Sequence, residues 1–229
     1  IRKIAKLKKK YNNFYSLDLN KIFSKFGSEN IYDKRNWYFA RSRFSQKGLN
    51  VISKTISKII DRIYSPASKV LILDCDNTLW GGVIGEDGLK SIKLGQDGVG
   101  KAYLDFQKVI KTLSKKGILL AISSKNNEKD VFEVFKKHQS MQIKKDEIVN
   151  FKVNWKDKSH NIINIAKELD LGLDSMVFWD DNPFERAQIK KKLPEVYTVE
   201  PNEDVTYWPE QLKELNEFGK FDVTKEDLQ

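Results

Sequence analysis

Short, continuous apolar runs are the clearest pattern in the chain, and they recur between residues 70 and 200. The runs at 70–73 and 118–122 lack the apolar–polar alternation of a half-exposed strand, so they predict strands buried on both faces. Similar runs predict further strands at 148–153, 175–179 and 196–199.

Segments with helical periodicity separate these runs. Residues 99–116 carry apolar side chains at 99, 103, 106, 109, 110 and 113, and Gly117 follows as a C-terminal signal. Asn127 and Ser159 are predicted to cap the next two helices, and Asn182 precedes a proline at a first helical position. Strands that alternate with helices predict an α/β fold, a parallel sheet with helices on both faces.

The two ends of the chain lack this alternation. Residues 1–66 are consistent with a strand at 13–17 and a helix at 49–63, followed by Pro66, and we interpret them as an N-terminal segment, the remnant of an upstream domain with a linker helix. Residues 67–200 form the predicted α/β domain. Residues 201–229 are predicted to form a tail that leads to a further domain. No initiator Met is present, and we expect the chain to be part of a longer protein.

Composition excludes several classes of protein. The hydrophobic fraction of 40% and aromatic fraction of 11% suffice for a core, which argues against a disordered chain. No apolar run approaches the roughly 20 residues of a membrane-spanning helix, and no membrane partner is expected. The single cysteine, Cys75, excludes an internal disulfide and favours a reducing, cytoplasmic location. One cysteine and two separated histidines also argue against structural zinc.

The net charge of +9 comes mainly from lysines spread along the chain. A solvated lysine-rich surface is the simplest explanation. The functional alternative is a field that attracts anionic substrates or an acidic partner protein. No nucleic-acid-binding motif accompanies the charge, so we expect no nucleic acid partner.

Polar residues follow four of the predicted strands. In an open parallel sheet, ligands bind beyond the carboxyl ends of the strands, so these side chains are expected to converge at one edge. In chain order they are Asp74 and Asp76, then Ser123 and Ser124, then Lys156 and Lys158, and finally Asp180 and Asp181.

Four neighbouring carboxylates repel one another unless a cation lies among them, and oxygen ligands suit Mg²⁺. A lysine and a hydroxyl beside that ion suit the oxygens of a phosphoryl group. A carboxylate not used for the metal can attack phosphorus and form an aspartyl-phosphate. Asp76 is placed to protonate the leaving group and then to activate water. The sequence therefore predicts Mg²⁺-dependent phosphoryl transfer.

Residues 74–79, DCDNTL, resemble the first motif, hhhDxDxT, of the haloacid dehalogenase (HAD) superfamily. Ser124, Lys158 and the pair Asp180-Asp181 resemble its second, third and fourth motifs. The resemblance implies a HAD-like Rossmannoid fold in which Asp74 is the nucleophile and Asp76 the acid/base. It implies Mg²⁺ ligation by Asp74, the carbonyl of Asp76, Asp180 and the nearby Asp181. It assigns phosphate or substrate binding to Thr78, Ser124, Lys125, Asn126 and Lys158.

A narrower resemblance covers roughly residues 30–227. DCDNTLWGGVIGEDG, SSKNNE, NWKDKSHNI and FWDDNPFER are similar to the FkbH-like branch (HAD-IIIC phosphatase type) of the superfamily. Characterised members of that branch load a glyceryl unit from 1,3-bisphosphoglycerate onto an acyl carrier protein. The resemblance implies a phosphorylated small molecule as substrate and an acyl carrier protein as partner. The alternative is a general phosphatase that acts on a sugar phosphate or similar small metabolite.

Cap domains of this superfamily follow the first motif or separate the second from the third. Only about twenty residues separate Leu79 from the helix near Val99, and one helix and one strand fill residues 124–158. We therefore expect no large cap, only a β-hairpin flap at residues 81–88 with a turn at Asp87-Gly88. Such a site stays open, which favours a large or protein-tethered substrate, or closure by another domain.

Several residues keep a second interpretation. The acidic pair before Asn182 is also explained as a capping cluster, and Lys158 as an ordinary surface lysine. Ser123 competes with Ser124 for the phosphate, with motif register favouring Ser124. Asn126 and Arg186 either touch substrate or brace helix ends.

Cys75 is expected to point away from its aspartate neighbours into apolar packing, with an acyl-accepting thiol as the alternative. Other phosphate-handling folds fit the sequence less well. A signalling receiver domain would place its acidic pair early in the chain, whereas here the pair comes last. A P-loop is absent, because no Lys-Ser/Thr follows the glycines at 81–88.

Overall fold

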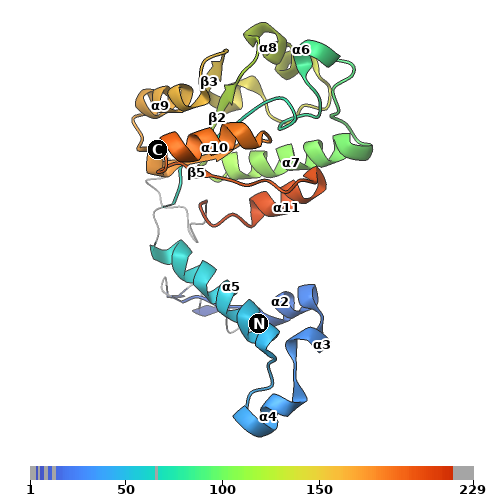
Figure 1. The fold of residues 1–229 in the computed structure, drawn as a ribbon, viewed down its shortest axis with the longest axis vertical. Helices are drawn as coiled ribbons and strands as arrows, with labels where there is room; N and C mark the ends of the chain where they lie inside the picture. Colours follow the sequence, from blue (N-terminus) through green and yellow to red (C-terminus); the bar gives the residue numbers. More distant parts are fainter. Residues whose placement is uncertain (1–3, 5, 8–9, 12–13, 65–66, 219–229) are drawn as a thin grey trace. The chain divides into compact units, whose positions relative to one another are not determined.

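The computed structural model describes residues 4, 6–7, 10–11, 14–64 and 67–218 (Figure 1). The chain divides into two compact units, Ile1–Tyr64 and Ser65–Gln229. No helix in the described ranges is long and apolar enough to cross a membrane.

The first unit is helical. Its core includes Phe23 and Ile31, and the rings of Tyr32 and Phe44 stack beside them. The predicted helix at 49–63 is confirmed and begins earlier, because the Ser45 hydroxyl accepts the Gly48 N–H at 3.0 Å. The elements are α2 (Leu19–Phe26), α3 (Ser28–Ile31), α4 (Lys34–Ala40) and α5 (Gln46–Tyr64).

The predicted strand at 13–17 is wrong for residues 14–17, which lie in no strand; residue 13 and Pro66 lie outside the described residues. The Phe14 N–H instead donates to the Tyr11 carbonyl in a local turn. A strand needs a neighbour to satisfy its backbone groups, and these residues pair with none among the described ones.

The second unit contains a five-stranded sheet in the order β3-β2-β1-β4-β5, and every pairing is parallel. All five predicted strands are confirmed: two have the predicted ends, and the ends of the other three differ by at most two residues. They are β1 (Val70–Leu73), β2 (Leu119–Ser124), β3 (Ile148–Val153), β4 (Met176–Trp179) and β5 (Tyr197–Thr198). The central strand β1 is fully buried, as its unbroken apolar run predicts.

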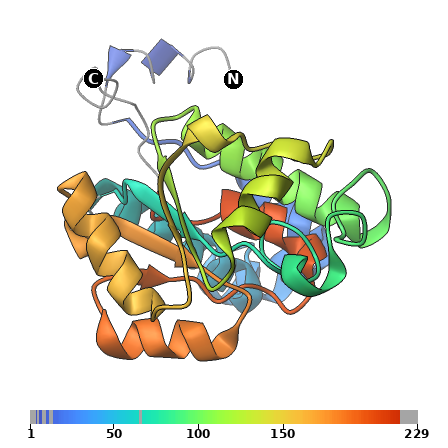
Figure 2. The ribbon, with the colours of Figure 1, turned by 90° about the horizontal axis from the view of Figure 1, so that it is seen from above.

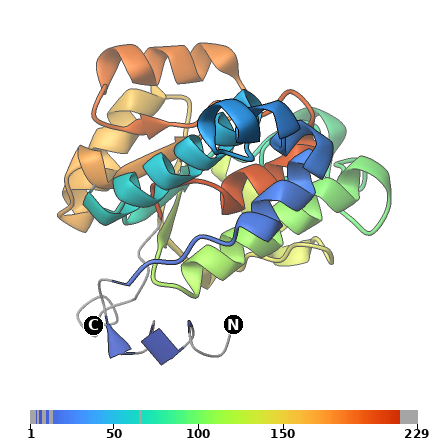
Figure 3. The ribbon, with the colours of Figure 1, turned by 90° about the horizontal axis from the view of Figure 1, so that it is seen from below.

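Helices cover both faces of this sheet, so the predicted α/β fold is confirmed. One face packs on α7 (Gly98–Ser114), α8 (Glu128–Lys137) and α11 (Trp208–Lys213). The other face packs on α9 (Lys158–Leu169) and α10 (Pro183–Lys192). Figures 2 and 3 show α7 and α10 on opposite sides of the strands. Three 3₁₀ turns complete the unit: η1 (Lys145–Glu147), η2 (Leu173–Ser175) and η3 (Val205–Tyr207).

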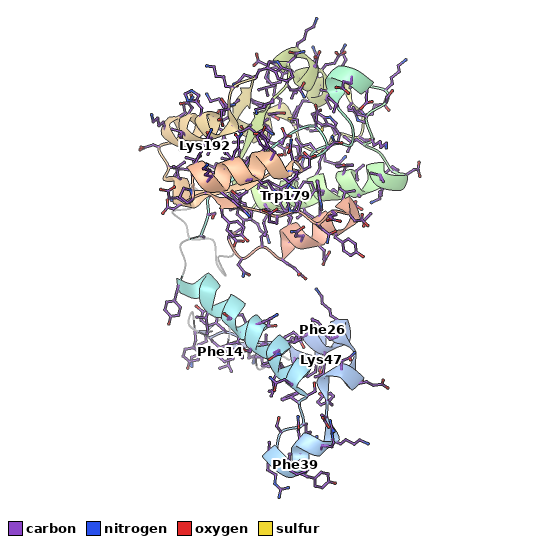
Figure 4. All side chains as sticks on the ribbon, viewed as in Figure 1. Phe14, Phe26, Phe39, Lys47, Trp179 and Lys192 are labelled. Carbon is purple, nitrogen blue, oxygen red and sulfur yellow. The ribbon has the colours of Figure 1, made fainter. Side chains whose placement is uncertain are left out.

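Residues 205–213, assigned to a tail in the sequence analysis, pack against α7. Trp208 is 4% exposed, and its ring contacts the rings of Phe106 and Trp179 at 5.5 and 5.7 Å between centroids. Trp179, which is labelled in Figure 4, is the last residue of β4. This aromatic cluster fixes the end of β4, directly before Asp180.

The predicted helix caps are only partly correct. Asn182 caps α10 by accepting the Phe184 N–H at 2.9 Å, as predicted. Ser159 was wrongly predicted to cap α9. The cap is Asp157, whose carboxylate accepts both the backbone N–H and the hydroxyl of Ser159.

The expected absence of a cap domain holds for the continuous residues 79–158, but the predicted β-hairpin flap is wrong. Gly81 and Lys93 form a single antiparallel bridge, and between them lies the helical turn α6 (Ile84–Asp87). The Asp87 carboxylate accepts the Val83 N–H at 2.7 Å and closes this turn, and Gly88 ends it with a φ of 72°. This internal cap favours a helical turn over two paired strands.

Candidate active site

The strand order explains why the candidate residues meet. β1 lies between β2 and β4, and Leu73 pairs with Ile122 on one side and Trp179 on the other. The residues that follow these three strands therefore leave the same edge of the sheet side by side. Asp74 occupies the centre of that edge.

Lys158 is a buried residue of this site and not a surface lysine. Its Nζ lies 3.1 Å from Asp74 Oδ1 and 2.6 Å from Asp180 Oδ2, and its side chain is 3% exposed. Burial opposes the charge of Lys158, but the carboxylates of Asp74 and Asp180 outweigh burial and raise the pKa of the ammonium above its usual value. Lys158 is therefore a fixed positive charge beside Asp74.

Asp74, Asp180 and Asp181 each offer a carboxylate oxygen, and these three oxygens lie within 4.8 Å of one another. Burial, followed by the charge of Asp74, raises the pKa of Asp180 to about 7 and that of Asp181 to about 6. Asp74 Oδ1 is buried and forms no well-oriented hydrogen bond despite its distance to Lys158. A hard divalent cation among these oxygens would favour the ionised form of Asp180 and Asp181 and would give Asp74 Oδ1 a partner. The donor set therefore fits Mg²⁺.

Asp76 is held by three donors. Its Oδ1 accepts the Trp80 indole N–H at 2.9 Å and the Ile84 backbone N–H at 3.1 Å, and its Oδ2 accepts the Asn126 amide at 2.7 Å. Burial raises the pKa of Asp76, and these hydrogen bonds act in the opposite sense. The side-chain NH₂ of Asn126 thus orients Asp76, and its side-chain oxygen, Oδ1, accepts the Asn127 backbone N–H at 3.0 Å.

Thr78 links the turn after β1 to the residues that follow β4. Its side chain is fully buried, and its hydroxyl accepts the Asp181 backbone N–H at 3.3 Å and lies 3.4 Å from the Asp181 carboxylate. The Thr78 N–H donates to the Cys75 carbonyl, in the turn that follows β1. Thr78 therefore fixes Asp181 in addition to the turn.

The two serines at the end of β2 lie on opposite faces of the sheet. Alternation along paired strands places Ser123 on the face of Asp74, and Ser124 on the face of Cys75. Both are buried, and Ser123 Oγ has no hydrogen-bond partner among the described residues. Both hydroxyls therefore remain candidate phosphate ligands.

Cys75 is fully buried in apolar packing, as predicted. Burial, and then the charge of Asp74, raise the pKa of its thiol well above the usual value. A neutral, inaccessible thiol is a poor nucleophile, which argues against the acyl-accepting alternative.

Arg186 braces the backbone of Asp180 and Asp181. Its Nη1 donates to the backbone carbonyls of Asp180 and Asp181 at 3.0 and 2.6 Å, and its Nε donates to Glu200 at 2.8 Å. Of the two roles left open by the sequence, these contacts support bracing.

Sequence reasoning missed two partners of the site. Trp80 is one, although its position four residues after Asp76 in a tight turn is a usable signal. Glu185 is the other: its Oε1 lies 2.6 Å from Lys125 Nζ, and no local pattern indicates that pair, since 60 residues separate its members.

The fold of this chain resembles that of a solved phosphatase domain. The chain is similar to the crystal structure of the N-terminal part of the protein BF1531 from Bacteroides fragilis, which contains a phosphatase domain complexed with Mg. The TM-score is 0.85 and the sequence identity 39%; the match covers 95% of this chain and 58% of that one. This chain thus spans less than two thirds of its structural neighbour. No family model and no curated protein matches the chain.

Proposed function

We propose that this chain is a Mg²⁺-dependent phosphatase or phosphotransferase of the HAD type, with an aspartyl-phosphate intermediate. The observation that carries the proposal is the buried Lys158 between Asp74 and Asp180, at 3.1 and 2.6 Å. Phosphoryl transfer through an aspartate requires a nucleophilic carboxylate, a fixed ammonium and further carboxylates, and here they lie together at one edge of the sheet. The likeness to a Mg-complexed phosphatase domain supports the same reading.

Mg²⁺ bound by Asp74, Asp180, Asp181 and the carbonyl of Asp76 would neutralise the oxygens of the phosphoryl group. Asp74 attacks phosphorus with one carboxylate oxygen, and the bond from phosphorus to the leaving oxygen breaks. Lys158 orients Asp74 and stabilises the negative charge of the transferred group. Asp76 gives its proton to the leaving oxygen.

Water then attacks the phosphorus of the aspartyl-phosphate. Asp76, now ionised, accepts a proton from that water, phosphate leaves and Asp74 is restored. Ser123, Ser124 and the N-terminus of α9 lie at the same edge and are available to bind phosphoryl oxygens.

For the substrate we propose 1,3-bisphosphoglycerate, whose glyceryl unit is loaded onto an acyl carrier protein as in the FkbH-like branch. The steps at Asp74 remove the 3-phosphate; the carrier thiol then attacks the acyl carbon, and the C–S bond forms as the C–O bond to the acyl phosphate breaks and phosphate leaves. The continuous motifs quoted above support this reading, as does a site edge that no domain-sized insert within residues 79–158 covers. The alternative is a general phosphatase for sugar phosphates or similar metabolites. The two readings differ in whether the acyl phosphate is strongly preferred.

The test is Mg²⁺-dependent phosphate release by the wild type, Asp74→Asn and the control Asp97→Asn. Asp97 is an exposed carboxylate whose side chain makes no capping hydrogen bond. We expect release by the wild type and the control and none by Asp74→Asn, with all three proteins folded. Turnover by Asp74→Asn would refute the nucleophile assignment. Preference for 1,3-bisphosphoglycerate over monoesters would support glyceryl loading, whereas broad release from monoesters would favour the general phosphatase.

A further inference from the structure

A second lysine at the site edge is held by a buried acid. Lys125 follows β2, and its Nζ lies 2.6 Å from Oε1 of Glu185, in the first turn of α10. The Glu185 side chain is 7% exposed, and its Oε2 is buried without a hydrogen-bond partner among the described residues. A buried carboxylate with one free oxygen is costly unless its counter-charge is held in place, so Glu185 restricts Lys125 to a narrow set of positions.

The Lys125–Glu185 pair spans the carboxyl end of β1, the strand that precedes Asp74. Lys125 leaves the sheet after β2, and α10 follows β4, so β1 lies between the two elements. The ion pair therefore reaches across the edge at which Asp74 leaves β1.

The two lysines of the site differ in accessibility. Lys158 is 3% exposed and contacts Asp74 and Asp180, so its charge serves the reacting centre. Lys125 is 33% exposed, and among the described residues Glu185 is the one carboxylate it contacts. An ammonium has three N–H donors, so Lys125 keeps donors for a ligand that approaches from solvent.

We propose that Glu185 is a positioning residue that fixes Lys125 as a specificity determinant for substrates carrying a second negative charge, on the group that leaves. This inference rests on the proposed phosphoryl-transfer function and adds the recognition of the leaving group. The phosphoryl group binds at Asp74 and Lys158, and Lys125 pairs with a carboxylate or phosphate at the far end of the molecule. A phosphate ester with a neutral tail lacks that contact.

The test uses two probes that differ by one group. In 3-phosphoglycerate a carboxylate replaces the terminal hydroxymethyl of glycerol 3-phosphate. We expect a higher kcat/KM for 3-phosphoglycerate in the wild type. In Lys125→Met that preference falls about five- to tenfold, the worth of one charge-assisted hydrogen bond. Lys125→Arg keeps the charge and retains most of the preference, and Lys111→Met, at an ion pair beside the amino end of β3, leaves the preference unchanged.

Glu185→Gln tests the positioning role. We expect the preference for 3-phosphoglycerate to fall in this variant and to fall no further when Glu185→Gln is added to Lys125→Met, because Glu185 acts through Lys125. The double variant also removes the unpaired buried charge that Lys125→Met alone leaves behind. A rise in the preference in Glu185→Gln would show that Glu185 competes with substrate and would overturn the positioning role. Additive effects of Glu185→Gln and Lys125→Met on the preference would overturn it as well.

Binding of the two probes, measured by calorimetry with Mg²⁺, separates this inference from the proposed function. If the wild type releases phosphate from no substrate, the proposed function fails, while calorimetry still compares the two probes. Tighter binding of 3-phosphoglycerate that is lost in Lys125→Met supports the inference. Equal binding of both probes, binding of neither, or a preference that survives in Lys125→Met overturns it.

Discussion

One guanidinium nitrogen of Arg186 donates to the backbone carbonyl of Asp181 at 2.6 Å, and the same nitrogen donates to the carbonyl of Asp180 at 3.0 Å. Both acceptors belong to residues whose carboxylates face Asp74. Arg186 is half-buried and is itself tied to Glu200. Thus a side chain outside the acidic cluster fixes the backbone that carries two of its members.

We predict that Arg186→Gln raises the Mg²⁺ concentration for half-maximal activity roughly tenfold, as other losses of supporting contacts around metal ligands do. At saturating Mg²⁺ the effect on kcat is smaller, because the carboxylates themselves remain. Lys190→Gln is the matched control, since Lys190 also contacts Glu200 but neither carbonyl. An Arg186→Gln enzyme with an unchanged Mg²⁺ requirement would contradict the bracing role.

The metal-free acidic cluster predicts a specific dependence of stability on pH. Burial raises the pKa of Asp180 to about 7 and that of Asp181 to about 6, above the value of about 3.9 for an unfolded chain. At pH values between the pKa of the unfolded chain and those of the folded protein, the folded protein binds protons that the unfolded chain has lost. The stabilisation is therefore complete below about pH 4 and is lost as pH rises through about 6 to 7.

In excess chelator, the contribution of Asp180 and Asp181 to the melting temperature should therefore decrease from pH 5 to pH 8. Thermal unfolding at several pH values measures this change. Added Mg²⁺ should stabilise the protein more at pH 8, where the carboxylates are ionised, than at pH 5. Asp180→Asn removes one of the two titrating groups and should flatten the pH dependence in chelator. Equal slopes for the wild type and Asp180→Asn would show that this carboxyl does not carry the effect. Phosphate release should also stop in chelator and return with Mg²⁺.

The sheet and the central acidic residues were predictable from sequence because their signals are local. An unbroken apolar run such as 70–73 fixes both the type of element and its burial, and the first polar residue after it marks the end of the strand. In a parallel sheet those ends share one edge, so the sequence alone predicts that Asp74, Lys158 and Asp180 meet there, as they do.

Partners that meet only through tertiary placement were not predictable. The Lys125–Glu185 pair depends on the positions of two strands and a helix, and neither residue stands out from the other charges in the sequence. The residues at 81–88 were misjudged for a different reason. The turn signal at Asp87-Gly88 is real, but the Asp87 side chain uses it to close a helical turn, and no partner strand competes. A short turn motif without a partner strand does not by itself distinguish a β-hairpin from a helical turn.

The buried environment of Cys75 predicts an inert thiol. Because burial and the charge of Asp74 raise its pKa, a thiol-specific reagent should not label the native protein at neutral pH and should label it once denatured. Cys75 is the single cysteine of the chain, so any labelling reports on this residue alone. Cys75→Ala should retain phosphate release, at a modest cost in stability from the lost packing. Rapid labelling of the native protein, or loss of thioester formation alone in Cys75→Ala, would restore the acyl-accepting role.

The hydrogen bond from Asn126 to Asp76 predicts a shift in the pH profile. The bond favours the ionised carboxylate, so its loss in Asn126→Ala adds to the rise in the Asp76 pKa that burial already causes. Hydrolysis of the intermediate needs ionised Asp76 as the base. The acid limb of the kcat profile should therefore move to higher pH, and kcat at neutral pH should fall.

Asn127→Ala is the matched control for this shift, because the Asn127 side chain bonds Asp130 and Trp155 and makes no contact with Asp76. The control should keep the wild-type profile. If Asn126 instead bound substrate directly, Asn126→Ala would raise KM and leave the acid limb of kcat in place. That result would remove Asn126 from the positioning of Asp76 and return it to substrate binding. The shift of the limb, more than the loss of rate, therefore identifies which partner the Asn126 amide serves during turnover.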